Sequence, residues 1–185
     1  MGKIIFITGG ARSGKSSFAE QYCTERSKNL GYIATAEALD NEMKDRIKKH
    51  QVQRGNIWET YECPLDIENA VESILNSHEY VLLDCITMYI SNMMFRNNLD
   101  FENISVEATN DIESAINTSM LAILEKVKNS KGNLVLVSNE IGLGIVPDNK
   151  LSRIYRDYVG RANQNCAKHA DEVYFLVSSI PLKIK

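Results

Sequence analysis

Five near-continuous apolar runs recur along the chain, and segments with helical periodicity separate them. The runs that we predict as strands cover residues 3–8, 31–35, 80–84, 133–138 and 172–178. Apolar residues follow one another within each run instead of alternating with polar ones, which is typical of parallel strands covered on both faces. Two shorter runs, at 58–61 and 182–185, predict additional edge strands.

Helical patterns fill the segments between these runs. The predicted helices cover residues 15–27, 40–54, 65–76, 86–95, 102–128 and 149–169. In the last of them the apolar residues form a single stripe, made of Leu151, Ile154, Tyr155, Tyr158, Val159, Ala162 and Cys166. Asp148, after Pro147, is its predicted N-cap. This alternation predicts a three-layer α/β sandwich with a mostly parallel sheet, and we expect a single domain over residues 1–185.

A glycine-rich loop directly follows the first predicted strand and has the spacing of a phosphate-binding P-loop. The loop comprises Gly9, Gly10, Ala11, Arg12, Ser13, Gly14, Lys15 and Ser16. Its glycines let successive backbone N–H groups point at one anion, and the following helix adds its positive end. We predict that Lys15 contacts the β- and γ-phosphates of a nucleoside triphosphate and that Ser16 binds Mg²⁺. The fold class becomes P-loop NTPase-like, of the RecA-like type.

A second motif ends the strand predicted at 80–84. Four mostly apolar residues precede Asp84, which is the form of a Walker B strand, and we predict Asp84 as the other Mg²⁺ ligand. Ligands of parallel sheets bind at the carboxyl ends of the strands. Thr35, Glu37 and Glu140 follow other predicted strands, so they are either part of the same site or polar residues of solvated loops.

One of the three histidines has a chemically suggestive setting. His50 lies on the apolar face of the helix predicted at 40–54, and Arg54 follows one turn later. A neutral imidazole can attack phosphorus and form a covalent intermediate, while an arginine can neutralise phosphate charge. The position equally fits a packed structural histidine. His78 and His169 are predicted to be structural or solvated.

The composition of the chain bears on its binding partners and on the compartment in which it functions. The 21 Lys and Arg residues are scattered and the net charge is -3, which argues against a nucleic-acid partner. No apolar run approaches the roughly 20 residues of a membrane span, and no signal peptide precedes the first predicted strand. Four separated cysteines are typical of reduced thiols in a cytoplasmic protein, without zinc-ligand spacing. They are Cys23, Cys63, Cys85 and Cys166.

Several segments, in order along the chain, resemble one enzyme family. They are Gly9–Ser16, Tyr32–Thr35, Arg46-Ile-x-x-His50-x-x-x-Arg54, Trp58-x-Thr-x-Glu62, Leu83–Thr87, Asn139–Pro147 and Gly160–Gln164. Together they resemble the bifunctional adenosylcobinamide kinase / adenosylcobinamide-phosphate guanylyltransferase of cobalamin biosynthesis. The resemblance extends to the tail at Lys185 and departs at Ser179, where many members have Gly.

The resemblance implies two reactions. ATP or GTP first phosphorylates the aminopropanol hydroxyl of adenosylcobinamide, and GMP is then transferred from GTP to that phosphate through a covalent histidine, which falls on His50. Beyond the P-loop, the nucleotide contacts that it implies are Thr35, Ala36, Glu37, Gln51, Val52, Gln53, Arg54, Glu62 and Asp84. It also implies a homo-oligomer, commonly a trimer. Candidate corrinoid contacts are Gly142, Gly144, Arg156, Arg161, Asn163 and Gln164, although 160–164 equally fits helix packing.

Two other functions stay open on the residues alone. One is a P-loop kinase of a different small alcohol, in which His50 only positions phosphate. The other is a regulatory nucleotide-binding switch. The chain lacks the guanine-selecting Asn-Lys-x-Asp segment of switch GTPases, which argues against this second function. The residues do not rank ATP against GTP as phosphate donor, and Glu37 and Glu140 are both candidates for the kinase base.

Overall fold

The predicted strands assemble into a single sheet in the computed structural model, which describes residues 1–37, 41, 44–45, 48, 52 and 55–185. The strands are β1 (Ile4–Gly9), β2 (Leu30–Ala34), β3 (Trp58–Glu62), β4 (Tyr80–Asp84), β5 (Asn133–Asn139), β6 (Glu172–Val177) and β7 (Ile180–Lys183). Their spatial order is β3-β2-β4-β5-β1-β6-β7. Among the described strands, β6 and β7 form the one antiparallel pair, so the predicted, mostly parallel sheet is confirmed.

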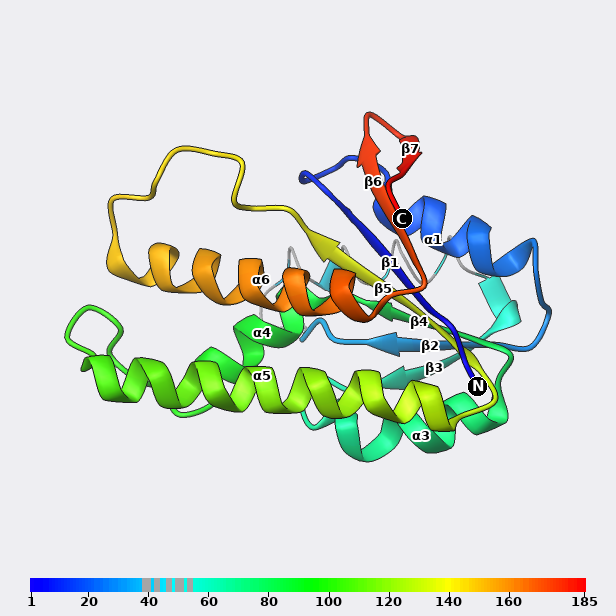
Figure 1. Ribbon diagram of the computed structural model, residues 1–185, viewed down its shortest axis with the longest axis horizontal. Helices are drawn as coiled ribbons and strands as arrows, with labels where there is room; N and C mark the ends of the chain where they lie inside the picture. Colours follow the sequence, from blue (N-terminus) through cyan, green and yellow to red (C-terminus); the bar gives the residue numbers. More distant parts are fainter. Residues whose placement is uncertain (38–40, 42–43, 46–47, 49–51, 53–54) are drawn as a thin grey trace.

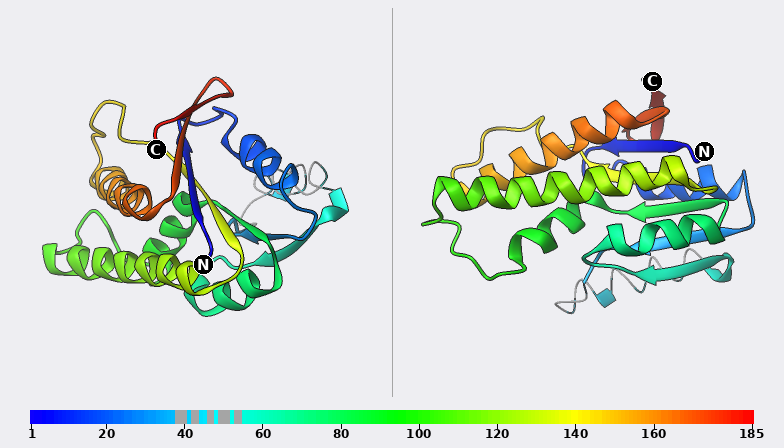
Figure 2. Two further views of the ribbon diagram at one scale, coloured as in Figure 1. Left: turned by 45° about the vertical axis from the view of Figure 1, so that its right-hand side comes forward. Right: turned by 60° about the horizontal axis from the view of Figure 1, so that its bottom comes forward.

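Helices cover both faces of this sheet, as Figures 1 and 2 show. On one face lie α3 (Ile67–Ser77), α4 (Ile86–Phe95), α5 (Val106–Asn129) and α6 (Lys150–His169), and on the other lies α1 (Lys15–Thr24). A short 3₁₀ turn, η1 (Gly55–Ile57), leads into β3. The three-layer α/β class predicted from the alternation of patterns is therefore confirmed.

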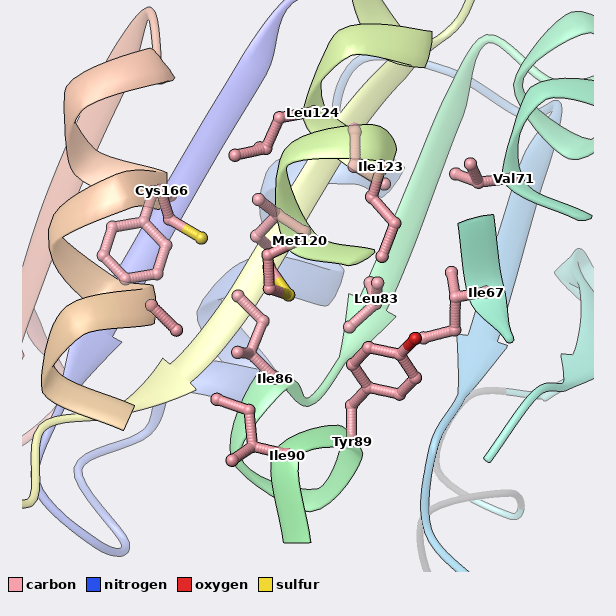
Figure 3. Close-up of a cluster of buried hydrophobic side chains, with 14 of the residues drawn as sticks. Ile67, Val71, Leu83, Ile86, Tyr89, Ile90, Met120, Ile123, Leu124 and Cys166 are labelled. Atoms are coloured by element: carbon pink, nitrogen blue, oxygen red, sulfur yellow. The ribbon is translucent and has the colours of Figure 1, made fainter. Parts of the chain in front are cut away.

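Successive side chains of a strand point to opposite faces, and the buried residues divide accordingly. Ile4 and Phe6 of β1 pack under α5 and α6, whereas Ile5 and Ile7 pack under α1. Figure 3 shows the larger cluster, in which residues of α3, α4, α5 and α6 meet the sheet. Because both faces of each central strand are buried, the sequences of these strands are apolar at nearly every position.

Some predicted boundaries were wrong for local reasons. Helix α5 begins at Val106 instead of residue 102, because the Ser105 hydroxyl accepts the Ala108 N–H (3.1 Å) and caps the helix there. Asp148 does not cap α6; the Asn149 side chain does, accepting the Ser152 N–H at 2.7 Å. Helix α1 ends at Thr24, three residues before its predicted end.

The two predicted edge strands are both present in the sheet. The edge strand at 58–61 is β3, and the tail strand is β7, displaced by two residues toward the N-terminus. The helix predicted at 40–54 falls largely outside the described residues. None of the helices in the described part of the chain has the length and apolar character that a bilayer span requires.

Candidate functional site

The carboxyl ends of the parallel strands bring the predicted motifs to one edge of the sheet. Ala34 of β2 is in register with Glu62 of β3 on one side and Asp84 of β4 on the other. Gly9, which opens the P-loop, is in register with Asn139 of β5. Because β5 lies between β1 and β4, the P-loop and the Asp84 carboxylate flank a single strand end. This edge is where open α/β sheets bind their ligands.

Backbone contacts hold the P-loop between β5 and the β6–β7 turn. The Glu140 N–H donates to the Gly9 carbonyl (2.9 Å), and the Ser179 N–H donates to the Ser13 carbonyl (2.8 Å). Gly14 has φ +91°, and a Cβ there would lie 2.6 Å from the Ser179 hydroxyl oxygen. Only glycine fits that position, for conformational and for steric reasons.

Lys15 lies inside the loop that its sequence motif predicted. Its side chain is 7% exposed, and its Nζ donates to the Gly10 carbonyl at 2.6 Å and lies 3.5 Å from the Ser13 Oγ. Helix α1 begins at this residue, so its positive N-terminal end points into the same loop. The ammonium group and the helix end together form an environment suited to phosphate oxygens.

Asp84 lies on the face of the sheet that carries α1. Leu82, two residues earlier, packs with Ala19 and Cys23 of α1, and the alternation of the strand places Asp84 on the same face. Its Oδ2 accepts a hydrogen bond from the Tyr32 hydroxyl of β2 at 3.1 Å. Sequence reasoning quoted Tyr32 within a motif but assigned it no role; a buried tyrosine near a strand end needs a hydroxyl partner, and that was the available signal.

The Cys85 thiol lies next to Asp84, where the charges of both motifs act on its pKa. Burial is the chief cause that raises the pKa of this thiol to about 11, and the Asp84 carboxylate contributes in the same direction. The Thr87 hydroxyl and the Lys15 ammonium act to lower the pKa. The charges of Asp84 and Lys15 are thus both felt at the residue that follows β4, in agreement with the strand register that places the two motifs on either side of β5.

Thr35 is placed differently from a simple nucleotide contact. Its side chain is fully buried, and its Oγ1 accepts the Cys85 N–H (2.8 Å) and donates to the Cys85 carbonyl (2.9 Å). The hydroxyl therefore supports the backbone that follows Asp84. The role predicted for Thr35 at the nucleotide stays a prediction.

The other predicted residues are only partly placed. Ala36 and Glu37 are half-buried, and Glu62 and Val52 are exposed. The Glu140 carboxylate accepts the Gly142 N–H at 2.8 Å. The remaining predicted nucleotide residues lie outside the described residues: His50, Gln51, Gln53 and Arg54.

The other two histidines have structural contacts. His78 is buried, with Nδ1 3.0 Å from the Ile74 carbonyl and Nε2 3.3 Å from a Glu59 carboxylate oxygen. His169 Nδ1 lies 2.8 Å from the Asn165 carbonyl at the end of α6. These contacts agree with the first of the two predicted alternatives, a structural histidine.

The residues at this edge fit a magnesium ion. Mg²⁺ prefers hard oxygen donors and takes one or two protein ligands, with substrate phosphates and water completing its shell. Asp84 offers an oriented carboxylate, and Ser16 offers a hydroxyl in the first turn of α1. Within the described ranges, no group of three or more His, Cys, Asp or Glu side chains is arranged to hold a metal.

Comparison with known proteins decides the family. Residues 5–184 match the sequence model of the protein family described as "Cobinamide kinase / cobinamide phosphate guanyltransferase". The chain belongs to this family. The resemblance predicted from the ordered motifs, and the enzyme class that it implied, are thereby confirmed for nearly the whole length.

Named relatives of this cobinamide kinase / guanyltransferase family cover the same length. The chain is 39% identical to the "Bifunctional adenosylcobalamin biosynthesis protein CobU" of Escherichia coli K12 and 40% identical to that of Salmonella typhimurium LT2. Each match covers 98% of this chain and 99% of the relative. The CobP protein of Pseudomonas aeruginosa is 36% identical, over 97% of this chain and 95% of its own length.

Among solved structures, a KaiC-like protein of Pyrococcus horikoshii OT3 aligns with a TM-score of 0.48 and 12% identity. The alignment covers 94% of this chain and 70% of that one. The fold class rests on the sheet order and the layers described above.

Proposed function

We propose that the chain catalyses both reactions of its family at the P-loop edge of the sheet. ATP or GTP phosphorylates the hydroxyl of adenosylcobinamide, and GTP then supplies GMP to the new phosphate. The observation that carries this proposal is the joint placement of Lys15 and Asp84 at one sheet edge, in a chain whose family match runs from residue 5 to 184.

In the phosphorylation step, the P-loop binds the triphosphate. Lys15 exchanges the Gly10 carbonyl for phosphate oxygens, because a charged oxygen is the stronger hydrogen-bond acceptor. Asp84 and Ser16 would hold Mg²⁺, which would offset charge on the β- and γ-phosphates. Either Glu37 or Glu140 takes the proton of the substrate hydroxyl as its oxygen attacks the γ-phosphorus. The bond from the γ-phosphorus to the β,γ-bridging oxygen breaks, and ADP or GDP leaves.

In the guanylyl transfer, His50 is the nucleophile. A ring nitrogen attacks the α-phosphorus of GTP, a P–N bond forms, and the P–O bond to pyrophosphate breaks. A phosphate oxygen of adenosylcobinamide phosphate then attacks the same phosphorus. The P–N bond breaks, the imidazole is restored, and adenosylcobinamide-GDP is released.

The test separates the two reactions in one protein. With GTP labelled at the α-phosphate and Mg²⁺, we expect label on the protein that is labile to acid and stable to base. His50→Ala should lose the label and retain phosphorylation of adenosylcobinamide, whereas Lys15→Ala should lose both. The matched control is His169→Ala, which removes a histidine remote from the P-loop and should retain both.

Two results would reject parts of this proposal. Normal labelling of His50→Ala would exclude His50 as the nucleophile and leave a kinase whose second step proceeds otherwise. Nucleotide hydrolysis without any transfer to adenosylcobinamide by the unaltered chain would favour the regulatory switch instead. Mass spectrometry of the labelled protein assigns the added GMP to one residue.

The proposal extends to assembly and compartment. A homo-oligomer, with a trimer as the expected form, is supported by exposed apolar residues on β6 and β7, namely Val177, Ile180 and Leu182. A cytoplasmic location is supported by the four cysteines, all of which are free thiols.

A further inference from the structure

We propose that Tyr32 is a positioning residue, which orients the Asp84 carboxylate for the divalent cation of a bound nucleotide. The proposal rests on the proposed function, because it takes Asp84 as a ligand of that cation. Tyr32 lies on β2 and Asp84 at the end of β4, 52 positions apart in sequence, and the Tyr32 hydroxyl donates to Asp84 Oδ2 at 3.1 Å.

The phenol is held firmly enough to fix the carboxylate. Tyr32 is only 5% exposed, and its ring meets the Trp58 ring edge-on, with centroids 6.0 Å apart and planes at 84°. Both rings belong to the buried cluster under α1. A hydroxyl on a ring packed in this way has few alternative positions, so the hydrogen bond restricts the carboxylate to one orientation.

The backbone that carries the carboxylate is held by the same strand. Thr35, just beyond β2, binds both the N–H and the carbonyl of Cys85 through its Oγ1. The Thr35 carbonyl in turn accepts a hydrogen bond from Asn92 Nδ2 of α4 at 2.8 Å. The β2 segment therefore fixes the Asp84 side chain through Tyr32 and the following peptide through Thr35.

Such support has a known consequence at metal sites. Groups that hydrogen-bond to a metal ligand fix its orientation, and their removal typically lowers metal affinity about 10-fold to 100-fold. A purely structural tyrosine would lower the stability of the fold without changing how the cation binds. Affinity for the cation, measured apart from turnover, therefore distinguishes the two roles.

The experiment compares Tyr32→Phe with Tyr22→Phe. Both tyrosines are 5% exposed and belong to the same buried cluster. Tyr22 lies on α1 and also donates to a carboxylate, at 3.3 Å from Oε1 of Glu172 on β6. Binding of Mn²⁺ is followed by the EPR signal of the free ion, with the protein saturated by the α,β-methylene analogue of GTP. Binding of the analogue without metal is measured by calorimetry in EDTA.

We expect Tyr32→Phe to raise the Mn²⁺ dissociation constant about 10-fold or more, with metal-free nucleotide binding unchanged. The Mg²⁺ concentration for half-maximal turnover should rise in parallel, and Tyr22→Phe should change neither. An unchanged Mn²⁺ constant in Tyr32→Phe, or an equal rise in Tyr22→Phe, would overturn the inference.

Asp84→Asn separates this inference from the proposed function. If Asp84→Asn weakens Mn²⁺ binding and Tyr32→Phe does not, only the role of Tyr32 is rejected. If Asp84→Asn leaves Mn²⁺ binding intact, the assignment of Asp84 as a metal ligand is rejected with it.

Discussion

At the β6–β7 turn, two serines adopt a backbone conformation that side chains rarely tolerate. Ser178 has φ +49° and Ser179 has φ +67°, in a left-handed region that costs a residue with a Cβ about 1–2 kcal/mol. The Ser179 N–H nevertheless donates to the Ser13 carbonyl of the P-loop. The contact between this turn and the P-loop therefore uses a backbone group that any residue except proline supplies.

Ser179→Gly should stabilise the protein. Glycine removes the conformational cost and keeps the N–H bond to Ser13, so we expect the melting midpoint to rise by about 2–4 °C for about 1 kcal/mol. Ser114→Gly, on the exposed face of α5, is the matched control and should lower it. A midpoint that falls in Ser179→Gly would mean that the serine hydroxyl contributes more than its backbone costs.

At the scale of elements, one carboxylate joins three helices. Glu68 of α3 accepts hydrogen bonds from the Tyr89 hydroxyl of α4 (2.9 Å) and the Ser119 hydroxyl of α5 (2.8 Å). Lys126 of α5 donates to the Glu68 backbone carbonyl. Burial acts to raise the pKa of the Glu68 carboxyl, but the hydrogen bonds from Ser119, from its own backbone and from Tyr89, with the Lys126 charge, leave the pKa below its ordinary value.

Glu68→Gln should therefore destabilise the fold in a pH-dependent way. A carboxylate whose pKa is lowered by folding contributes stability above its unfolded pKa, near 4.3, and loses it as pH falls through the folded value. We expect a loss of about 1–3 kcal/mol at pH 7, measured by denaturant unfolding. The difference in the free energy of unfolding between Glu68→Gln and the unaltered protein should shrink as the pH is lowered below about 4.

The control for this change is Glu125→Gln on the exposed surface of α5. It removes a carboxylate of the same kind from a neighbouring helix and should leave stability nearly unchanged at both pH values. An equal loss for Glu68→Gln at every pH would indicate altered packing of the amide instead of loss of the charged acceptor.

At the scale of the whole molecule, an apolar face of the sheet extends beyond the helices. Val177 and Ile180 are register partners on β6 and β7, and Leu182 lies opposite Phe175. Val177, Ile180, Leu182 and Ile184 are between 48% and 66% exposed. Large exposed apolar patches are typical of sites that bind a protein, a membrane or a ligand, and the proposed homo-oligomer assigns this one to a second copy of the chain.

We expect light scattering to give a mass that is a multiple of 20.9 kDa, three times that value for a trimer. Changing Leu182 and Ile184 together to Lys should shift the protein toward the monomer, because a charge buried at an interface without a partner is costly. Val106→Lys, at an exposed apolar residue of α5, should leave the mass unchanged. A monomer before any change would reject the oligomer.

The order of the elements and the position of the P-loop between a strand and a helix were predictable from local pattern. Apolar runs of strand length, the spacing of Gly9, Gly14 and Lys15, and a carboxylate at the end of an apolar run depend only on near neighbours in the chain. The start of α5 was mispredicted because a single capping side chain, Ser105, outweighed the apolar pattern.

The amino-acid sequence alone determined which elements form, where the glycine-rich P-loop motif lies and to which family the chain belongs, because these properties are encoded in short segments. Only the tertiary structure decided that β4 pairs with β2 and β5, and therefore that Tyr32 and Thr35 support Asp84 and Cys85. Pairing between distant strands depends on how both faces of the sheet are packed, and no local spacing encodes it.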